Sequence, residues 1–316
     1  MLVSRKVPFV RTLNAMITGT FLDEISHDIP AANWSAQEWE QDFQAMQTAG
    51  IDTVILIRVG YQDKATFPSK VLAKANKILL VQEDLVELFL NLSEQYGMAF
   101  YFGTYDSGEF WHSGQYQKEV DLNLALVDEV WERYGHHKAF QGWYISHEIN
   151  TFDEGVMRVY EQLAQHLRSL KNLPILISPY VRGTKQFEDA ITLEEHEKEW
   201  EEVFSRIQGL VDIVAFQDGQ VHYDELPDYL RVNSNLARKY SLKCWSNVET
   251  FDRDMPIKFP PIGWPKLRFK LEAARASQVD KLITFEFSHF LSPNSIYPAA
   301  HHLNKRYLEW LREIKT

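Results

Sequence analysis

Residues 35–59, SAQEWEQDFQAMQTAGIDTVILIRV, join a helical pattern to a strand pattern through a single glycine. Ser35, followed three residues later by Glu38, forms a capping box ahead of an apolar run with helical period. Gly50 stands where that helix should end. The β-branched run Thr53–Val59 then predicts a buried strand. A helix that leads directly into a buried strand is typical of a parallel sheet with helical crossovers.

The same alternation runs along the whole chain. Strands are predicted at Ala15–Thr20, Thr53–Val59, Met98–Thr104, Phe140–Ser146, Ile175–Pro179, Ile213–Gln217, Lys243–Val248 and Leu282–Phe287. Helices are predicted near residues 35–49, 82–96, 117–134, 154–171, 194–209, 223–240, 264–277 and 298–314. Eight such units close most simply into a barrel, and no glycine-rich phosphate motif favours a doubly wound sheet. We therefore predict an α/β fold, a (β/α)8 TIM barrel, with residues 1–316 as one domain.

The composition of the chain argues against two classes of binding partner, nucleic acids and membranes. The formal charge of −11 argues against nucleic acid, because phosphate binding needs clustered Lys and Arg. No run approaches the roughly 18 apolar residues of a membrane span, and the N-terminus lacks the apolar segment of a signal peptide. The lone Cys244 excludes an intrachain disulfide and suits a reducing compartment. We expect a cytoplasmic protein with no nucleic-acid or membrane partner; the oligomeric state stays open.

In a barrel of this kind, the loops that follow the strands build the catalytic face. Nearly every predicted strand ends in a polar or ionisable side chain: Asp23 and Glu24, Arg58, Tyr105 and Asp106, His147 and Glu148, Tyr180 and Arg182, Gln217 and Asp218, Asn247 and Glu249, then Glu286, Ser288 and His289. A purely structural barrel needs no such rim, so the set favours an active site. Singly, Asp23, Glu24, Asp106 and His289 could be caps or loop polarity, and Arg58 could orient a catalytic carboxylate or neutralise a structural one.

Glu148 and Glu249 follow the fourth and seventh predicted strands. Glycosidic cleavage needs one protonated carboxyl to assist the leaving group and one ionised carboxyl to attack or stabilise the sugar cation. Two glutamates on one barrel rim can supply both. Trp111 and Trp264 lie in or next to the predicted top loops, where flat apolar faces can stack on sugar rings. The predicted partner is a carbohydrate.

The stretches Gly142–Glu148 and Trp245–Glu249 resemble the large clan of retaining TIM-barrel glycoside hydrolases, whose acid/base follows strand 4 and whose nucleophile follows strand 7. More narrowly, Ile17–Asp23, Trp34–Asp42 and Gly50–Ile55 resemble a little-characterised family of barrel proteins described as candidate glycoside hydrolases. The clan usually carries Asn before the strand-4 glutamate, where it binds the sugar 2-hydroxyl. This chain has His147 there instead.

The resemblance implies a catalytic domain that cleaves O-glycosidic bonds of an oligo- or polysaccharide with retention, with Glu148 as general acid/base and Glu249 as nucleophile. We expect no cofactor and no bound metal. The expected substrate-binding residues are Asp23, Glu24, Arg58, Tyr105, Asp106, Trp111, His147, Tyr180, Gln217, Asp218, Asn247, Trp264, Glu286 and His289.

Two other functions remain open at this point. Glu148, Asp218, His222 and Glu286 offer an oxygen-rich set with one imidazole, as a divalent-metal sugar isomerase or epimerase would use. Alternatively, the barrel could bind carbohydrate without turning it over. The arrangement of the rim carboxyls in space discriminates between these functions.

Overall fold

The computed structural model describes residues 16–75, 77–255 and 258–315. Within these residues, eight parallel strands form a closed barrel in the order β1-β2-β6-β8-β9-β10-β11-β12, with β12 paired to β1. The strands are β1 Ile17–Leu22, β2 Thr53–Leu56, β6 Ala99–Gly103, β8 Phe140–Tyr144, β9 Ile175–Ile177, β10 Ile213–Gln217, β11 Lys243–Glu249 and β12 Lys281–Phe285. The predicted (β/α)8 barrel is confirmed; Ala15, where the first strand was expected to begin, lies outside the described residues.

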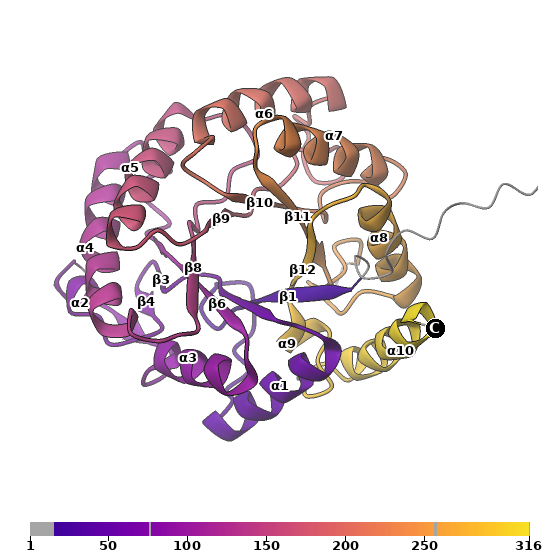
Figure 1. Ribbon diagram of the computed structural model, residues 1–316, viewed down its shortest axis with the longest axis horizontal. Helices are drawn as coiled ribbons and strands as arrows, with labels where there is room; N and C mark the ends of the chain where they lie inside the picture. The colour runs from indigo at the N-terminus through magenta and orange to yellow at the C-terminus, as the bar shows by residue number, and fades with distance from the viewer. Residues whose placement is uncertain (1–15, 76, 256–257, 316) are drawn as a thin grey trace, which may run out of the picture.

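Helices surround the barrel as a continuous outer ring (Figure 1). They are α1 Ala36–Ala49, α3 Leu85–Tyr96, α4 Tyr116–Tyr134, α5 Glu154–Leu170, α6 Leu193–Ile207, α7 Leu226–Lys239, α8 Trp264–Ala276 and α10 Pro298–Lys315. The expected capping box forms, because the Ser35 backbone N–H donates to Glu38 Oε2 at 2.8 Å. Gly50 ends α1 with a positive φ of 90°, a backbone conformation that favours glycine.

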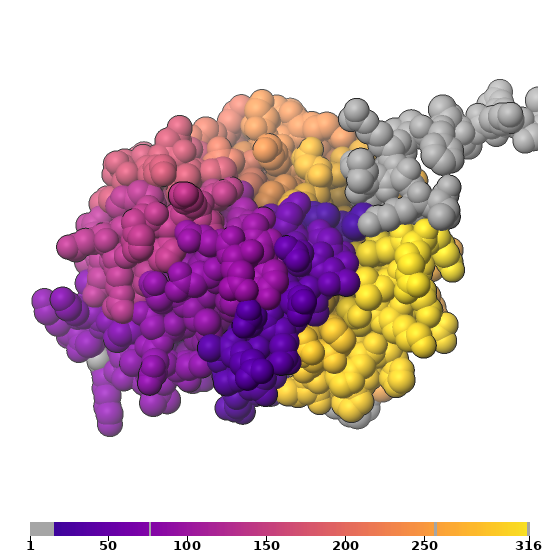
Figure 2. Space-filling model, turned by 60° about the horizontal axis from the view of Figure 1, so that its bottom comes forward, coloured from indigo at the N-terminus to yellow at the C-terminus, as the bar shows by residue number. Residues whose placement is uncertain are grey.

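The ring closes where β1, the first described strand, meets α10, the last helix. The backbone N–H of Ile17 in β1 donates to the Tyr307 hydroxyl of α10 at 2.8 Å. In Figure 2 the indigo surface of the first βα unit lies directly against the yellow surface of the C-terminal helix. The first and last units therefore pack as neighbours, as a closed barrel requires.

The core has two layers that follow from the alternation of side chains along each strand. Inside the barrel lie Phe21, Ile55, Tyr101, Tyr144, Leu176, Ala215, Trp245 and Ile283. Side chains on the outer faces pack against the helices, among them Val54, Phe100, Trp143, Val214 and Val248. Because both faces are buried, the strands are almost continuously apolar in sequence.

Residues 60–81 connect β2 to α3 and form short elements that the sequence pattern does not predict. They contain β3 Gly60–Tyr61, β4 Lys64–Ala65, α2 Lys70–Ala75 and β5 Leu79–Leu80. With β7 Tyr105–Asp106 these strands form a small second sheet in the order β5-β4-β3-β7. The last barrel strand also ends earlier than predicted, at Phe285, and Glu286 instead begins the short helix α9 Phe287–Phe290.

Candidate active site

A cavity of about 310 Å³ lies at the carboxyl ends of the barrel strands. The predicted site residues that line it are Arg58, Asp106, Trp111, Glu148, Tyr180, Gln217, Asn247 and Glu249. The remainder of its wall comes from Ser26, His27, Asp28, Ile29, Ile57, Tyr61, His112, Phe251, Arg253, Phe259 and Phe285. The structure therefore brings the strand-4 and strand-7 glutamates to one cavity.

Glu148 follows β8 and is held by neutral donors. Tyr144, four residues earlier, donates its hydroxyl to Oε1 at 2.9 Å, and the Gln217 amide donates to Oε2 at 3.0 Å. Arg58 Nη2 lies 3.9 Å from Oε1, and 23% of the Glu148 side chain is exposed. Burial raises the pKa of Glu148 above its ordinary value, although Arg58 acts in the opposite direction.

Glu249, the last residue of β11, is bound by a cation. Arg253 donates from Nε to Oε2 at 2.7 Å and from Nη2 to Oε1 at 2.8 Å. The guanidinium itself lies over the rings of Phe251 and Phe259, 4.9 and 5.4 Å from their centroids. Burial alone acts to raise the pKa of Glu249, but Arg253 outweighs it and the pKa lies below its ordinary value.

The Glu249 carboxylate also lies close to Gly219, in the loop that follows β10. A Cβ atom at this position would lie 1.6 Å from Glu249 Oε2. A side chain at position 219 therefore cannot coexist with Glu249 in its present place. Behind this contact, Asp218 accepts the Glu249 backbone N–H at 2.9 Å and binds Lys270 Nζ at 2.7 Å.

The two glutamates thus have pKa values shifted in opposite directions at one cavity. Environments that separate the pKa values of two carboxyls assign one the role of acid and the other the role of base or nucleophile. Here burial raises the pKa of Glu148, whereas Arg253 lowers the pKa of Glu249.

Asp106 connects the cavity wall to Arg58. Its Oδ1 accepts the Trp111 indole N–H and the Gly108 backbone N–H, both at 2.8 Å. Its Oδ2 lies 3.3 Å from Arg58 Nε. Burial acts to raise the pKa of Asp106, but the Arg58 charge prevails and lowers it. Asp106 therefore fixes the position of Trp111 and anchors the cation that faces Glu148.

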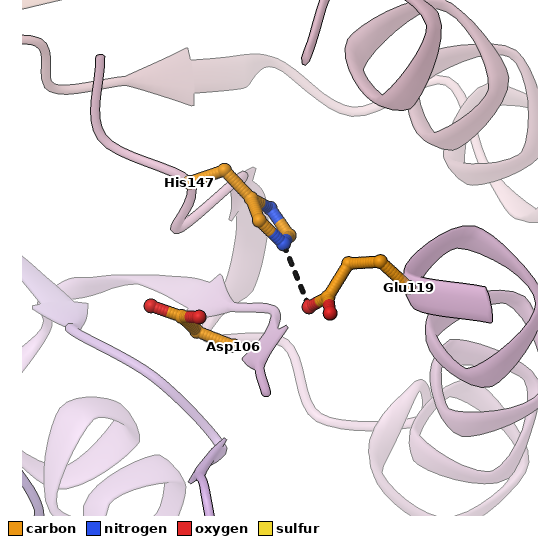
Figure 3. A group of neighbouring side chains, drawn as sticks. All are labelled: Asp106, Glu119 and His147. Carbon is orange, nitrogen blue, oxygen red and sulfur yellow. Dashed lines mark hydrogen bonds and ion pairs between the residues drawn. The ribbon is translucent and has the colours of Figure 1, made fainter. Parts of the chain in front are cut away.

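His147 does not line the cavity. Its ring turns toward α4, where Nε2 lies 2.9 Å from Glu119 Oε1 (Figure 3). Both side chains are fully buried, and Trp111 meets the His147 ring edge-on at 5.5 Å. His147, at the position where the clan carries asparagine, therefore contacts helix α4 and does not line the cavity.

Asp106, Glu119 and His147 are also the described residues whose spacing fits a metal ion. One ligand atom from each lies within 4.8 Å of the others. The Asp106 oxygens, however, already bind Trp111, the Gly108 backbone and Arg58. These hydrogen bonds and the ion pair give both carboxylate oxygens of Asp106 a partner without a metal ion.

Other predicted rim residues form a separate buried cluster. Glu286 accepts the backbone N–H groups of Ser288 and His289 at 3.0 and 2.7 Å, which caps α9. His289 Nδ1 lies 2.6 Å from Glu286, and Nε2 lies 3.7 Å from Glu24. Burial opposes the charged form of His289, yet Glu286 raises its pKa to about 9. Burial also raises the pKa of Glu24 to about 7. These residues do not line the cavity.

Three more predicted residues have local roles. Asp23 Oδ1 accepts the backbone N–H groups of Ile25 and Ser26 at 2.9 Å. Tyr105 donates its hydroxyl to the backbone carbonyl of Gln62, between β3 and β4, at 2.8 Å. Trp264 begins α8 and packs against a tryptophan of α10, with ring centroids 6.0 Å apart. Their side chains do not line the cavity either.

The residues proposed for a metal-dependent isomerase are not assembled in the part of the chain that the structure describes. Asp218 is paired with Lys270, and Glu286 caps a helix. His222 is exposed and does not line the cavity. The geometry gives this alternative no shared metal centre.

Several contributors to the site were missed from sequence. Tyr144 was assigned to a strand, although its place four residues before Glu148 allows an inward side chain. Arg253 lies four residues after Glu249, which was a usable signal for an ion pair. Glu119 and Gly219 gave no signal, because an acidic residue in an amphipathic helix and a glycine in a loop are both commonplace.

The fold and cavity define a (β/α)8 barrel with a carboxylate pair at its rim. The family described as Domain of unknown function (DUF4434) matches residues 17–297, and the chain belongs to this family. No curated protein sequence matches the chain.

Among solved structures, a candidate alpha-L-fucosidase from Bacteroides thetaiotaomicron is 48% identical, with a TM-score of 0.92 over 98% of this chain and 99% of that one. The GH113 beta-mannanase of Alicyclobacillus acidocaldarius is 11% identical, with a TM-score of 0.58 over 96% and 99%. The endo-1,4-beta-D-mannanase of Thermotoga petrophila is 8% identical, with a TM-score of 0.57 over 95% and 99%. The two mannanases share the fold, and these similarities confirm the resemblance to TIM-barrel glycoside hydrolases. Across the described residues, no helix is long and apolar enough to cross a membrane.

Proposed function

We propose that this protein is a retaining glycoside hydrolase, with Glu148 as general acid/base, Glu249 as nucleophile and residues 1–316 acting as one catalytic domain. The observation that carries the proposal is the opposite shift of the two pKa values at one cavity. Burial favours the protonated form of Glu148, and Arg253 favours the ionised form of Glu249. Hydrolysis of a glycosidic bond requires this pair of states.

The reaction takes two steps. Glu249 attacks the anomeric carbon while Glu148 transfers its proton to the departing glycosidic oxygen, so one sugar becomes an ester on Glu249 and the other leaves as an alcohol. Glu148, now ionised, removes a proton from water, and the resulting hydroxide displaces Glu249 from the anomeric carbon. Both carboxyls return to their starting states, and retention follows from two inversions.

Arg253 covers Glu249, of which only 2% of the side chain is exposed. The arginine must shift when the sugar binds, so that an oxygen of Glu249 reaches the anomeric carbon. The partial exposure of Arg253, at 20%, and its place in a loop allow such a shift. Arg253 thereby holds the nucleophile ionised until substrate arrives.

The cavity has a polar and an apolar side. Asn247 Oδ1 is buried without a hydrogen-bond partner, so it is available to accept a sugar hydroxyl. Ile29, Phe251 and Phe285 provide the apolar side. A 6-deoxy sugar carries a methyl group where other hexoses carry a hydroxymethyl group, and an apolar wall suits a methyl group. Because the 48% identical relative is named a candidate alpha-L-fucosidase, α-L-fucosides are the first substrates to test.

The test is hydrolysis of a panel of 4-nitrophenyl glycosides that includes the α-L-fucoside and the α-L-galactoside, which differ only at C6. We expect turnover of at least one glycoside, with the fucoside preferred to the galactoside. Proton NMR of the first-formed sugar should show the anomer of the substrate. Release of the opposite anomer would exclude retention, and a preference for the galactoside would exclude the 6-deoxy assignment.

Glu148→Gln and Glu249→Gln should each reduce turnover by orders of magnitude while leaving the thermal midpoint within a few degrees of wild type. Normal activity in either variant removes that residue from its role. Sugar binding with no turnover in the wild-type protein would favour the non-catalytic alternative. Loss of turnover on chelation, restored by Mn²⁺, would favour a metal-dependent enzyme.

A further inference from the structure

A second hollow, of about 250 Å³, adjoins the central cavity above the connection from β8 to α5. The two share Trp111, His112, Glu148 and Tyr180 as a common border. The side chains that line only the second hollow are Tyr116, Ile149, Asn150, Thr151, Asp153 and Val156. We call it the α5 hollow. It is similar in size to the central cavity, so it can hold a unit of similar size.

The two glutamates differ in how they relate to these spaces. Glu148 borders both, whereas Glu249 lines the central cavity and not the α5 hollow. A general acid must reach the oxygen that joins the sugar under attack to its leaving group. The sugar that reacts with Glu249 therefore occupies the central cavity, and its leaving group lies on the Glu148 side.

We propose that the α5 hollow is the leaving-group subsite and that it accepts a neutral or amino sugar. This assignment rests on the proposed glycosidase function. The sugar ring lies among Trp111, Tyr116 and Tyr180, whose aromatic faces suit the C–H surface of a pyranose. Asn150 stands beside them and provides an amide for sugar hydroxyls, while Thr151, whose hydroxyl donates to Glu199, keeps an oxygen that can accept one.

The charges of the residues that line the α5 hollow limit which sugars it can accept. The carboxylic acids among its lining residues are Glu148 and Asp153. Asp153 accepts the Val156 backbone N–H at 2.8 Å through Oδ1, and its Oδ2 lies 3.4 Å from the Tyr116 hydroxyl. A uronic acid would place its carboxylate beside that of Asp153, and the like charges would repel. A neutral hydroxyl or an ammonium group meets no such penalty.

A third hollow, of about 380 Å³, lies on the opposite side of the cavity beyond Arg253 and Phe259, with Gln186 on its edge. Glu148 does not line it. A leaving group bound there would be out of contact with the acid. Gln186, which is exposed, therefore provides a matched control position.

The experiment compares a glycosyl fluoride with a disaccharide of the same reacting sugar. The probes are α-L-fucosyl fluoride and α-L-fucosyl-galactose, or the matching pair for the glycone that the panel selects. Fluoride leaves without help from an acid and occupies almost none of the leaving-group subsite. Asn150→Trp fills the α5 hollow, Asn150→Ala removes its amide without added bulk, and Gln186→Trp fills the opposite hollow.

For Asn150→Trp we expect kcat/KM for the disaccharide to fall roughly tenfold or more, while kcat/KM for the fluoride stays within about twofold of wild type. Asn150→Ala should show a smaller change in the same direction, which covers the case in which the tryptophan variant does not fold. Gln186→Trp should leave both values unchanged. A disaccharide ending in galacturonic acid should be a poorer substrate than the galactose one, and Asp153→Asn, which keeps the helix cap, should reduce that difference.

If the disaccharide and fluoride change together in both Asn150 variants, or if only Gln186→Trp impairs the disaccharide, the subsite assignment is wrong. Equal cleavage of the neutral and acidic disaccharides contradicts the charge argument. If the wild-type protein cleaves neither probe nor any glycoside of the panel, it is the glycosidase proposal that fails. The two failures are therefore distinguishable.

Discussion

Replacing Gly219 with alanine tests whether Glu249 must occupy its observed position to act. The added Cβ would lie 1.6 Å from Glu249 Oε2, and the next contacts are also to Glu249 and to Arg253 Nε, at 2.3 and 2.6 Å. Gly219 does not have a positive φ, so alanine adds bulk without backbone strain. The substitution therefore acts on the Glu249–Arg253 pair alone.

The magnitude follows from contact distances. Non-bonded heavy atoms lie about 3.5 Å apart at their optimum, so the carboxylate must move by more than about 1.5 Å. A misplacement of about 1 Å at a reacting centre costs on the order of 100-fold in rate. The carboxylate is the end of a flexible side chain, so the stability cost should stay near the lower end of overpacking, about 1 kcal/mol.

The assay is kcat/KM on the best glycoside of the panel, together with the thermal midpoint. Gly263→Ala is the control, because a Cβ there would meet no atom within 4 Å and its φ is ordinary. We expect a loss of about 100-fold in Gly219→Ala and almost none in the control. Activity within twofold of wild type in Gly219→Ala would show that the observed position of Glu249 has no part in catalysis.

Further predictions concern titration. Arg253→Met leaves Glu249 buried without its cation, so the pKa of Glu249 should rise and the acidic limb of kcat/KM should move to higher pH; an unmoved limb would refute the role of the ion pair. Tyr144→Phe removes a hydrogen bond that lowers the pKa of Glu148, so the basic limb of kcat/KM should move to higher pH, whereas a shift to lower pH would contradict the argument. His289, with its pKa raised to about 9 from 6.5, stabilises the fold fully below pH 6.5, and this contribution is lost as the pH rises through 9. The wild-type protein should have a higher thermal midpoint than His289→Gln at pH 6.5, and this difference should decrease as the pH rises to 9. A difference that stays constant would contradict the raised pKa of His289.

The barrel was predictable because burial on both faces makes its strands apolar and β-branched, and because glycines such as Gly50 and Gly97 end the intervening helices. The small second sheet, β5-β4-β3-β7, was not predictable from the sequence. Its strands are two residues long, too short to show any period, and they are held by neighbours distant in sequence, as in the pairing of Gly60 with Tyr105.

For the candidate site, sequence located the rim but could not choose among its polar residues. Glu286 and Glu148 each follow a barrel strand, yet Glu286 turns inward to cap α9 while Glu148 faces the cavity. The pairing of Glu249 with Arg253 depends on the path of a loop, so the pKa difference between the glutamates could not be read from spacing.

The contact between His147 and Glu119 has a consequence for how this barrel can be recombined. Helices of the outer ring are often treated as interchangeable packing, but α4 supplies the partner of a residue adjacent to Glu148. A chimera that exchanges α4 for a foreign helix would leave a buried imidazole unsatisfied one residue from that glutamate. The loop after β8 and the helix α4 therefore depend on each other, and grafting or directed evolution of this barrel has to move them together.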